Sequence, residues 1–319
     1  MKYYLGVDLG GTNIVAGVVD EHYNIIAKHR EPTDTGRSFE DIVASIAHTA
    51  HKAVENASLT MQDIEGVGIG APSCIDPKTN LLVNSNNFGW QNVPFPDELK
   101  KHFDRPLFIR NDADCAALGE ALAGAAKDYD SAVMATLGTG VGGGVILNKR
   151  IFSGCDNMGA EIGHTKLVFH GEKCTCGQLG CLEAYASATA LIRQAKEAAR
   201  AHPDSLLNTL CGDDLENMEA KTAFDAMAQG DKTATEVIDR YISYLAAGLS
   251  SLVAIFRPEA IIIGGGVSNA GDVLLKPLNE KLFQSTYAAT EIGVPPVVRA
   301  QLGNDAGIVG AAMLARSNQ

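Results

Sequence analysis

Residues 3–20 read YYLGVDLGGTNIVAGVVD, and this stretch decides how the chain folds. Apolar and polar residues alternate on both sides of the turn Gly10-Gly11-Thr12, which predicts two strands at 3–8 and 14–19. A third alternating stretch follows at 25–30. We therefore expect the chain to begin with an antiparallel meander of three strands.

The same pattern returns later in the chain. Residues 132–137 read as a strand, 138–144 as a glycine turn and 145–147 as a second strand. Strands and helices alternate after each copy, which predicts an α/β fold. Two copies indicate two similar lobes, and a fold of that kind binds a ligand in the cleft between its lobes.

The remaining elements follow from the spacing of apolar residues. Short buried strands are predicted at 66–70, 107–110 and 260–263. Helices are predicted at 38–57, 112–125, 184–201, 220–229, 231–256, from about 271, and at 306–316. Residues 203–217 are polar and are predicted to be an irregular surface segment.

Composition limits the class of protein. The chain has 319 residues, which suggests two domains or lobes, and its net charge is −12. An acidic surface repels nucleic acids and anionic membranes, so we expect neither as a partner. The N-terminus lacks the pattern of a signal peptide, and no apolar run approaches the roughly 20 residues of a membrane span. We expect a cytoplasmic protein.

Three glycine loops are candidates for phosphate binding, because glycine lets backbone amides approach a phosphate closely. They are Asp8 to Thr12, Gly138 to Gly144, and Gly264 to Gly266. The alternative is that they are only tight turns. Asp8 favours the phosphate interpretation, since a carboxylate beside a phosphate requires a cation such as Mg²⁺ between them.

Other nucleotide motifs do not fit. Gly138, Gly140 and Gly143 match GxGxxG, but a strand follows where a dinucleotide site needs a helix. The same loop resembles that of protein kinases, yet HRD, DFG and VAIK are missing from the sequence. The P-loop pattern GxxxxGK[ST] is missing too.

A cysteine cluster predicts a metal site. His164 precedes Cys174, Cys176 and Cys181 in the spacing H-x9-C-x-C-x4-C, and three cysteines with one histidine form a closed zinc set. Such a site leaves no open coordination position, so the zinc would be structural. The alternative is a reduced, buried cysteine cluster. The other four cysteines are expected to be small buried or loop residues; they are Cys74, Cys115, Cys155 and Cys211.

Two acidic residues lie at the ends of this loop. Glu161 is three residues before His164, and Glu183 is two residues after Cys181. Zinc would fix both in one place, which favours a role in substrate binding over that of solvated surface residues.

Several segments together resemble the ROK family of repressors, open reading frames and sugar kinases, and within it the bacterial glucokinases. The resemblance covers the chain from Asp8 to the C-terminal helix, with a weak zone at 203–219. The matching residues are Asp8 to Thr12, Asn87 to Trp90, Asn111 to Ala113, Leu137 to Gly140, Gly159 to His164, Cys174 to Ser187, and Gly264 to Gly266.

The resemblance implies an actin-like (ribonuclease H-like) fold with ATP between two lobes, and homodimers. The small lobe would be 1–112 plus about 303–319, and the large lobe 113–302. Asp112 would be the catalytic base. The sugar would be held by Asn87, Asn111, Asp112, Glu161, His164 and Glu183, with His164 serving zinc through its other ring nitrogen. ATP and Mg²⁺ would lie at Asp8, Gly10, Gly11, Thr12, Gly138, Thr139, Gly140, Gly264, Gly265 and Gly266.

The expected function is ATP-dependent phosphorylation of a hexose at its 6-hydroxyl, with glucose as the expected sugar. Ser73 stands where the family often has glycine, so an N-acetylmannosamine kinase or another hexose kinase is the alternative. A sugar-responsive repressor is a remote alternative, because only seven residues precede Asp8 where repressors carry a DNA-binding domain. A nonenzymatic sugar-binding protein is opposed by Asp112, although this residue could also be a helix N-cap.

Overall fold

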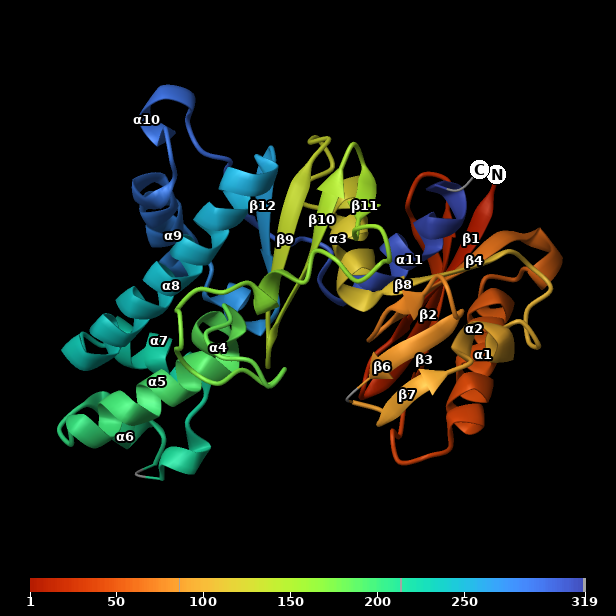
Figure 1. The fold of residues 1–319 in the computed structure, drawn as a ribbon. Helices are drawn as coiled ribbons and strands as arrows, with labels where there is room; N and C mark the ends of the chain where they lie inside the picture. Colours follow the sequence, from red (N-terminus) through yellow and green to blue (C-terminus); the bar gives the residue numbers. More distant parts are fainter. Residues whose placement is uncertain (86, 213, 318–319) are drawn as a thin grey trace. The chain divides into compact units, whose positions relative to one another are not determined.

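The computed structural model describes residues 1–85, 87–212 and 214–317. Two five-stranded sheets and one three-stranded sheet carry the fold, which is the predicted α/β class (Figure 1). The first sheet has the order β3-β2-β1-β4-β8, with β3 Ile25–Pro32, β2 Asn13–Asp20, β1 Tyr3–Leu9, β4 Ile64–Ala71 and β8 Leu107–Asn111. The small sheet has the order β5-β6-β7, with β5 Ile75–Asp76, β6 Leu81–Ser85 and β7 Trp90–Val93.

The second five-stranded sheet has the order β11-β10-β9-β12-β13. Its strands are β11 Arg150–Phe152, β10 Val141–Leu147, β9 Ala132–Leu137, β12 Ala260–Gly264 and β13 Val297–Arg299. The helices are α1 Phe39–Asn56, α2 Phe95–Leu99, α3 Asp112–Ala123, α4 Glu183–Ala186, α5 Ala188–Ala201, α6 Leu206–Leu210, α7 Ala220–Ala228, α8 Lys232–Phe256, α9 Asp272–Ser285, α10 Ala289–Ile292 and α11 Ala306–Ser317.

The chain divides into two compact units. Unit 1 comprises 1–132, 144–160 and 301–319, and unit 2 comprises 133–143 and 161–300. In this division α3 and 144–160 group with the N-terminal part of the chain. The bounds that we predicted for the two lobes stay a prediction.

The core of unit 1 lies between the first sheet and α1. The antiparallel pairing of β1 with β2 and of β2 with β3 confirms the predicted meander. Ile42, Val43 and Ile46 come from one face of α1 and are buried with the strand residues. Ser38 caps the N-terminus of this helix, because its side chain accepts a hydrogen bond from the Asp41 amide.

Helix α11 also packs against this sheet and against α3. Glycine makes this packing possible, because a Cβ atom at Gly68 would meet the Ala311 carbonyl oxygen. Gly119 of α3 and Gly310 of α11 allow the same close approach between helices. The small residues of α11 therefore bring its N-terminal end close to β1.

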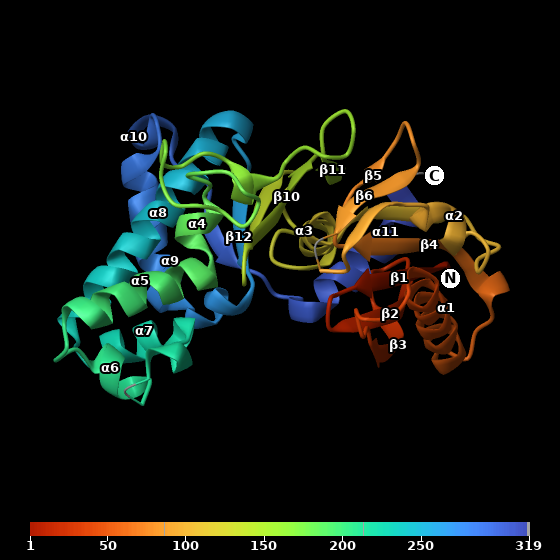
Figure 2. The ribbon, with the colours of Figure 1, turned by 60° about the horizontal axis from the view of Figure 1, so that its bottom comes forward.

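In unit 2 a layer of helices packs around α8, whose neighbours are α4, α5, α7 and α9 (Figures 1 and 2). Tyr241, Leu245 and Leu249 lie on the buried side of α8. The Tyr241 hydroxyl donates to the Ala186 carbonyl at 2.7 Å, which fixes α8 against the end of α4.

Four predictions about elements were wrong or incomplete. The predicted helix 184–201 is two helices, because Ser187 caps α5 by accepting from the Ala190 amide. The predicted irregular segment 203–217 contains α6, which Ser205 caps by accepting from the Leu207 amide, while the Asp231 carboxylate accepts from the Leu206 amide. The second glycine turn is shorter than predicted, since β10 already begins at Val141. Seven further elements were not predicted, because each is too short to show a periodicity of apolar residues: β5–β7, β11, β13, α2 and α10.

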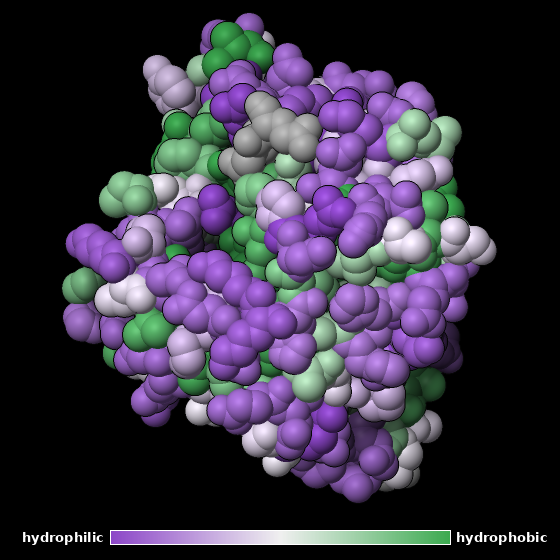
Figure 3. Space-filling model, turned by 90° about the vertical axis from the view of Figure 1, so that its right-hand side faces the viewer, coloured by the Kyte–Doolittle hydropathy of each residue, from purple (hydrophilic) through white to green (hydrophobic). Residues whose placement is uncertain are grey.

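Among the described residues, no helix is both long and apolar enough to cross a membrane. The face drawn in Figure 3 is covered mostly by hydrophilic side chains, with hydrophobic ones in scattered groups.

Candidate active site and metal centre

The predicted residues gather in two groups, one in each unit. In unit 1, β1, β4 and β8 are parallel neighbours, so their carboxyl ends meet at one sheet edge. Asp8 lies near the end of β1, Asn111 ends β8, and Asp112 begins α3. The strand register therefore brings Asp8 and Asp112 close enough for their charges to interact.

Asp8 carries the strongest electrostatic signal of this group. Burial, and then the charge of Asp112, raise the pKa of its carboxyl from 3.8 to about 7. Helix α11 approaches closely here, since a Cβ atom at Gly307 would lie 2.9 Å from Asp8 Oδ2. A nearby cation would stabilise the charged form of this carboxylate and lower its pKa.

Asn111 holds the start of α3. Its Oδ1 accepts from the Ala113 amide at 2.9 Å and from the Asp114 amide at 3.3 Å. Asn111 is thus the N-cap, and the alternative interpretation of Asp112 as the cap is wrong. Asp112 is the first residue of the helix, and its Oδ1 accepts from the Ala113 amide at 2.8 Å.

The first glycine turn is held by Thr33. The Thr33 hydroxyl donates to the Gly10 carbonyl at 2.6 Å, and its amide donates to the Thr12 carbonyl at 2.9 Å. A Cβ atom at Gly11 would lie 3.8 Å from Asn87 Nδ2, so Asn87 also adjoins the turn. A cavity of about 670 Å³ opens on Asp8, Gly10, Gly11 and Thr12, with Lys28 and Arg30 on its wall.

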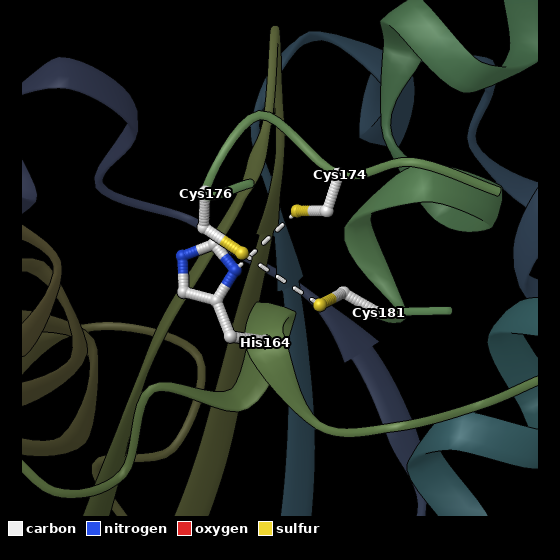
Figure 4. A group of neighbouring side chains, drawn as sticks. All are labelled: His164, Cys174, Cys176 and Cys181. Atoms are coloured by element: carbon white, nitrogen blue, oxygen red, sulfur yellow. Dashed lines mark hydrogen bonds between the residues drawn. The ribbon is translucent and has the colours of Figure 1, made fainter. Parts of the chain in front are cut away.

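In unit 2 the four predicted metal ligands come together (Figure 4). One ligand atom of each lies within 4.8 Å of the others. Cys176 Sγ is 3.8 Å from Cys181 Sγ, and Cys174 Sγ is 3.7 Å from His164 Nδ1. Zinc–sulfur bonds of about 2.3 Å at tetrahedral angles separate two sulfurs by about 3.8 Å. The cluster therefore fits a structural zinc ion, and all seven cysteines are free of disulfides.

Glu161 and His164 share one turn, because the His164 amide donates to the Glu161 carbonyl at 3.0 Å. Nδ1 of His164 faces the cysteines, and its other ring nitrogen points away from them (Figure 4). Burial raises the pKa of Glu161, although the charge of His164 opposes this shift.

Glu183 begins α4 and is buried. Its Oε1 accepts from the Thr175 hydroxyl at 2.5 Å and from Cys174 Sγ at 3.2 Å, and its Oε2 accepts from the Val141 amide at 3.1 Å. Burial alone would raise the pKa of this carboxyl, but the hydrogen bonds outweigh burial and hold the pKa below its ordinary value.

The second and third glycine loops adjoin each other in unit 2. Gly265 has a φ of 77°, and a Cβ atom there would meet the Leu137 carbonyl oxygen, so this position requires glycine. Leu137 is the residue before the 138–140 turn, which the Ala188 amide fixes by donating to the Gly138 carbonyl at 2.8 Å. Beside the third loop, at Gly266, lies a cavity of about 430 Å³ lined mainly by apolar residues, including Phe224, Val267 and Val273.

Known proteins resemble this chain over its whole length. The profile of the ROK family matches residues 4–318. The chain belongs to the ROK family. The glucokinase of Thermotoga maritima is 40% identical over 311 residues, covering 97% of this chain and 96% of that protein.

Two solved ROK structures are also similar. The Streptomyces griseus ROK glucokinase, in complex with glucose and AMPPNP, is 37% identical with a TM-score of 0.80, and the match covers 99% of each chain. The Thermus thermophilus ROK hexokinase is 33% identical with a TM-score of 0.83, covering 99% of this chain and 98% of that chain. These matches confirm the predicted family and fold.

Sequence reasoning missed some residues beside the site. Thr175 lies between two predicted ligands, Cys174 and Cys176, which was a signal that it would adjoin the metal loop. Phe224 and its neighbours line the apolar cavity, but their spacing is that of any amphipathic helix. The contact of Val141 with Glu183 could not be predicted from the sequence, because its donor is a backbone amide and does not depend on residue type.

Proposed function

We propose that this protein is a glucokinase, which transfers the γ-phosphoryl group of ATP to the 6-hydroxyl of glucose. The observation that carries this proposal is the full-length similarity to the S. griseus ROK glucokinase, whose structure contains glucose and AMPPNP. The similarity to the T. maritima glucokinase supports it.

In this proposal, residues of unit 1 accept the proton of the sugar hydroxyl and hold the cation that offsets part of the phosphate charge. Asp112 accepts the proton of the 6-hydroxyl as the hydroxyl attacks phosphorus, and a positioned base of this kind contributes about 10²–10⁴-fold. Asp8 would hold Mg²⁺, which offsets phosphate charge when bound. The amides of the Gly10–Thr12 turn would hold phosphate oxygens.

The residues of unit 2 would bind the sugar and the nucleotide. Glu161, Glu183 and the ring nitrogen of His164 that points away from the cysteines would offer hydrogen-bond partners to sugar hydroxyls, and Asn87 and Asn111 of unit 1 would do the same. The four-ligand cluster would bind zinc, which fixes His164 and the loop before Glu183. The apolar cavity beside Gly266 suits the adenine base, and the 138–140 and 264–266 loops suit the phosphates.

A coupled assay of the purified protein with ATP and a panel of hexoses tests the proposal. We expect glucose to give the highest kcat/KM. A preference for N-acetylmannosamine would favour the alternative kinase, and phosphorylation of no hexose in the panel would refute the proposal.

A homodimer and a cytoplasmic location stay predictions. Sedimentation analysis tests whether the protein is a homodimer.

A further inference from the structure

Glu183 connects two functional segments of unit 2. Its Oε1 accepts from Thr175 in the metal loop, at 2.5 Å, and its Oε2 accepts from the amide of Val141, at 3.1 Å. Val141 is the first residue of β10, directly after the 138–140 glycine turn. One buried carboxylate thus links the metal loop to the turn.

We propose that Thr175 is a positioning residue, whose hydroxyl orients Glu183 both for the sugar and for the 138–140 turn. The sugar part of this inference rests on the proposed glucokinase function.

The hydrogen-bond donors of Glu183 support this role. A buried carboxylate needs partners for both oxygens, and those partners fix its rotation. Of its three donors, Cys174 would lose its S–H proton on binding zinc, and Val141 contributes a backbone amide. Thr175 is thus the donor whose side chain has no other assigned task. Without its hydroxyl, the carboxylate could turn about its side-chain bonds and release the Val141 amide.

The position of Thr175 makes the inference testable. Its side chain is exposed, so an isosteric valine removes the hydroxyl without disturbing the core. Thr175→Ser keeps the hydroxyl. Thr235→Val is a matched control, because the exposed Thr235 on α8 donates its hydroxyl only within its own helix turn, to the Asp231 carbonyl at 2.7 Å.

The experiment combines two readouts on the full chain: hydrogen exchange of the Val141 amide, resolved by NMR, and steady-state kinetics with glucose and ATP. Zinc content and melting temperature are measured on every variant. For Thr175→Val we expect Val141 to exchange about fivefold to tenfold faster and KM for glucose to rise by a similar factor, with zinc content unchanged. Thr175→Ser and Thr235→Val should stay within about twofold of wild type.

Two results would overturn the inference. The first is wild-type exchange at Val141 in Thr175→Val. The second is a loss of zinc and of thermal stability in Thr175→Val that accounts for both changes, since Thr175 would then only support the metal loop. Wild-type protein that phosphorylates no hexose would instead refute the proposed function, and exchange at Val141 would still decide whether Thr175 orients Glu183.

Discussion

Glu183 lies directly against Gly140, so that a Cβ atom at position 140 would collide with Glu183 Oε2. The sequence suggested glycine at this turn because amides must approach phosphate. The structure adds a second reason, because the side chain of Glu183, a predicted sugar-binding residue, occupies the space beside Gly140. A substitution at Gly140 therefore disturbs both predicted functions of unit 2.

The glycine turn can still be tested at its first residue. A Cβ atom at Gly138 has no neighbour within 4 Å, so Gly138→Ala should fold normally. We expect it to weaken ATP binding about tenfold, because the methyl group would stand where phosphate approaches. Gly140→Ala should weaken both ATP and glucose binding. Unchanged ATP affinity of Gly138→Ala, measured by calorimetry, would indicate that this loop is only a tight turn and does not bind phosphate.

The cluster of His164 and three cysteines predicts the metal content of the protein. We expect about one zinc per chain in protein purified without chelators, by elemental analysis. Cys176→Ser should abolish it, and glucose affinity should fall with it because the loop loses its anchor. Cys155→Ser is the control, since this exposed cysteine lies outside the cluster. Wild-type protein without zinc would contradict the metal assignment.

The raised pKa of Asp8 predicts how stability depends on pH. The folded protein keeps the Asp8 proton up to about pH 7, whereas the unfolded chain loses it near 3.8. The folded state binds the extra proton between these values, so this residue lowers stability as pH rises through that window. In magnesium-free buffer we expect Asp8→Asn to be more stable than wild type at pH 8 by about 1–2 kcal/mol, because the substitution removes a carboxylate charge that solvent screens only in part.

Denaturant titrations of both proteins at pH 8 and at pH 4 provide the measurement. At pH 4 the difference should nearly vanish, because Asp8 is then protonated in the folded protein. An equal difference at the two pH values would show that burial and Asp112 do not destabilise the Asp8 carboxylate.

The apolar cavity of unit 2 predicts a selective effect on the nucleotide. Ala228 is exposed and lines this cavity, so Ala228→Trp should fill it without disturbing the core. We expect KM for ATP to rise about tenfold and KM for glucose to stay unchanged. The neighbouring exposed Gln229 does not line the cavity, which makes Gln229→Trp the control. A rise of KM for glucose instead would mean that the cavity is not the adenine site.

Much of this arrangement could be predicted from sequence, because its signals are local. The meander around Gly10 and Gly11 follows from alternation, and the metal cluster follows from the spacing of His164 and three cysteines. Other features depend on contacts between distant segments. The bond from Val141 to Glu183 joins positions 42 residues apart, and the cap at Asn111 depends on where α3 begins rather than on residue type.

In the proposed mechanism, Asp112 accepts the proton of the sugar hydroxyl. Because Asn111 caps α3, Asp112→Asn leaves the cap in place and should fold and bind glucose as wild type does. Single-turnover phosphoryl transfer from ATP to glucose is the most direct measurement. We predict a rate lower by about 10²–10⁴, equivalent to about 3–5 kcal/mol of barrier, with glucose affinity retained. A transfer rate near that of wild type in Asp112→Asn would contradict the assignment of Asp112 as the base.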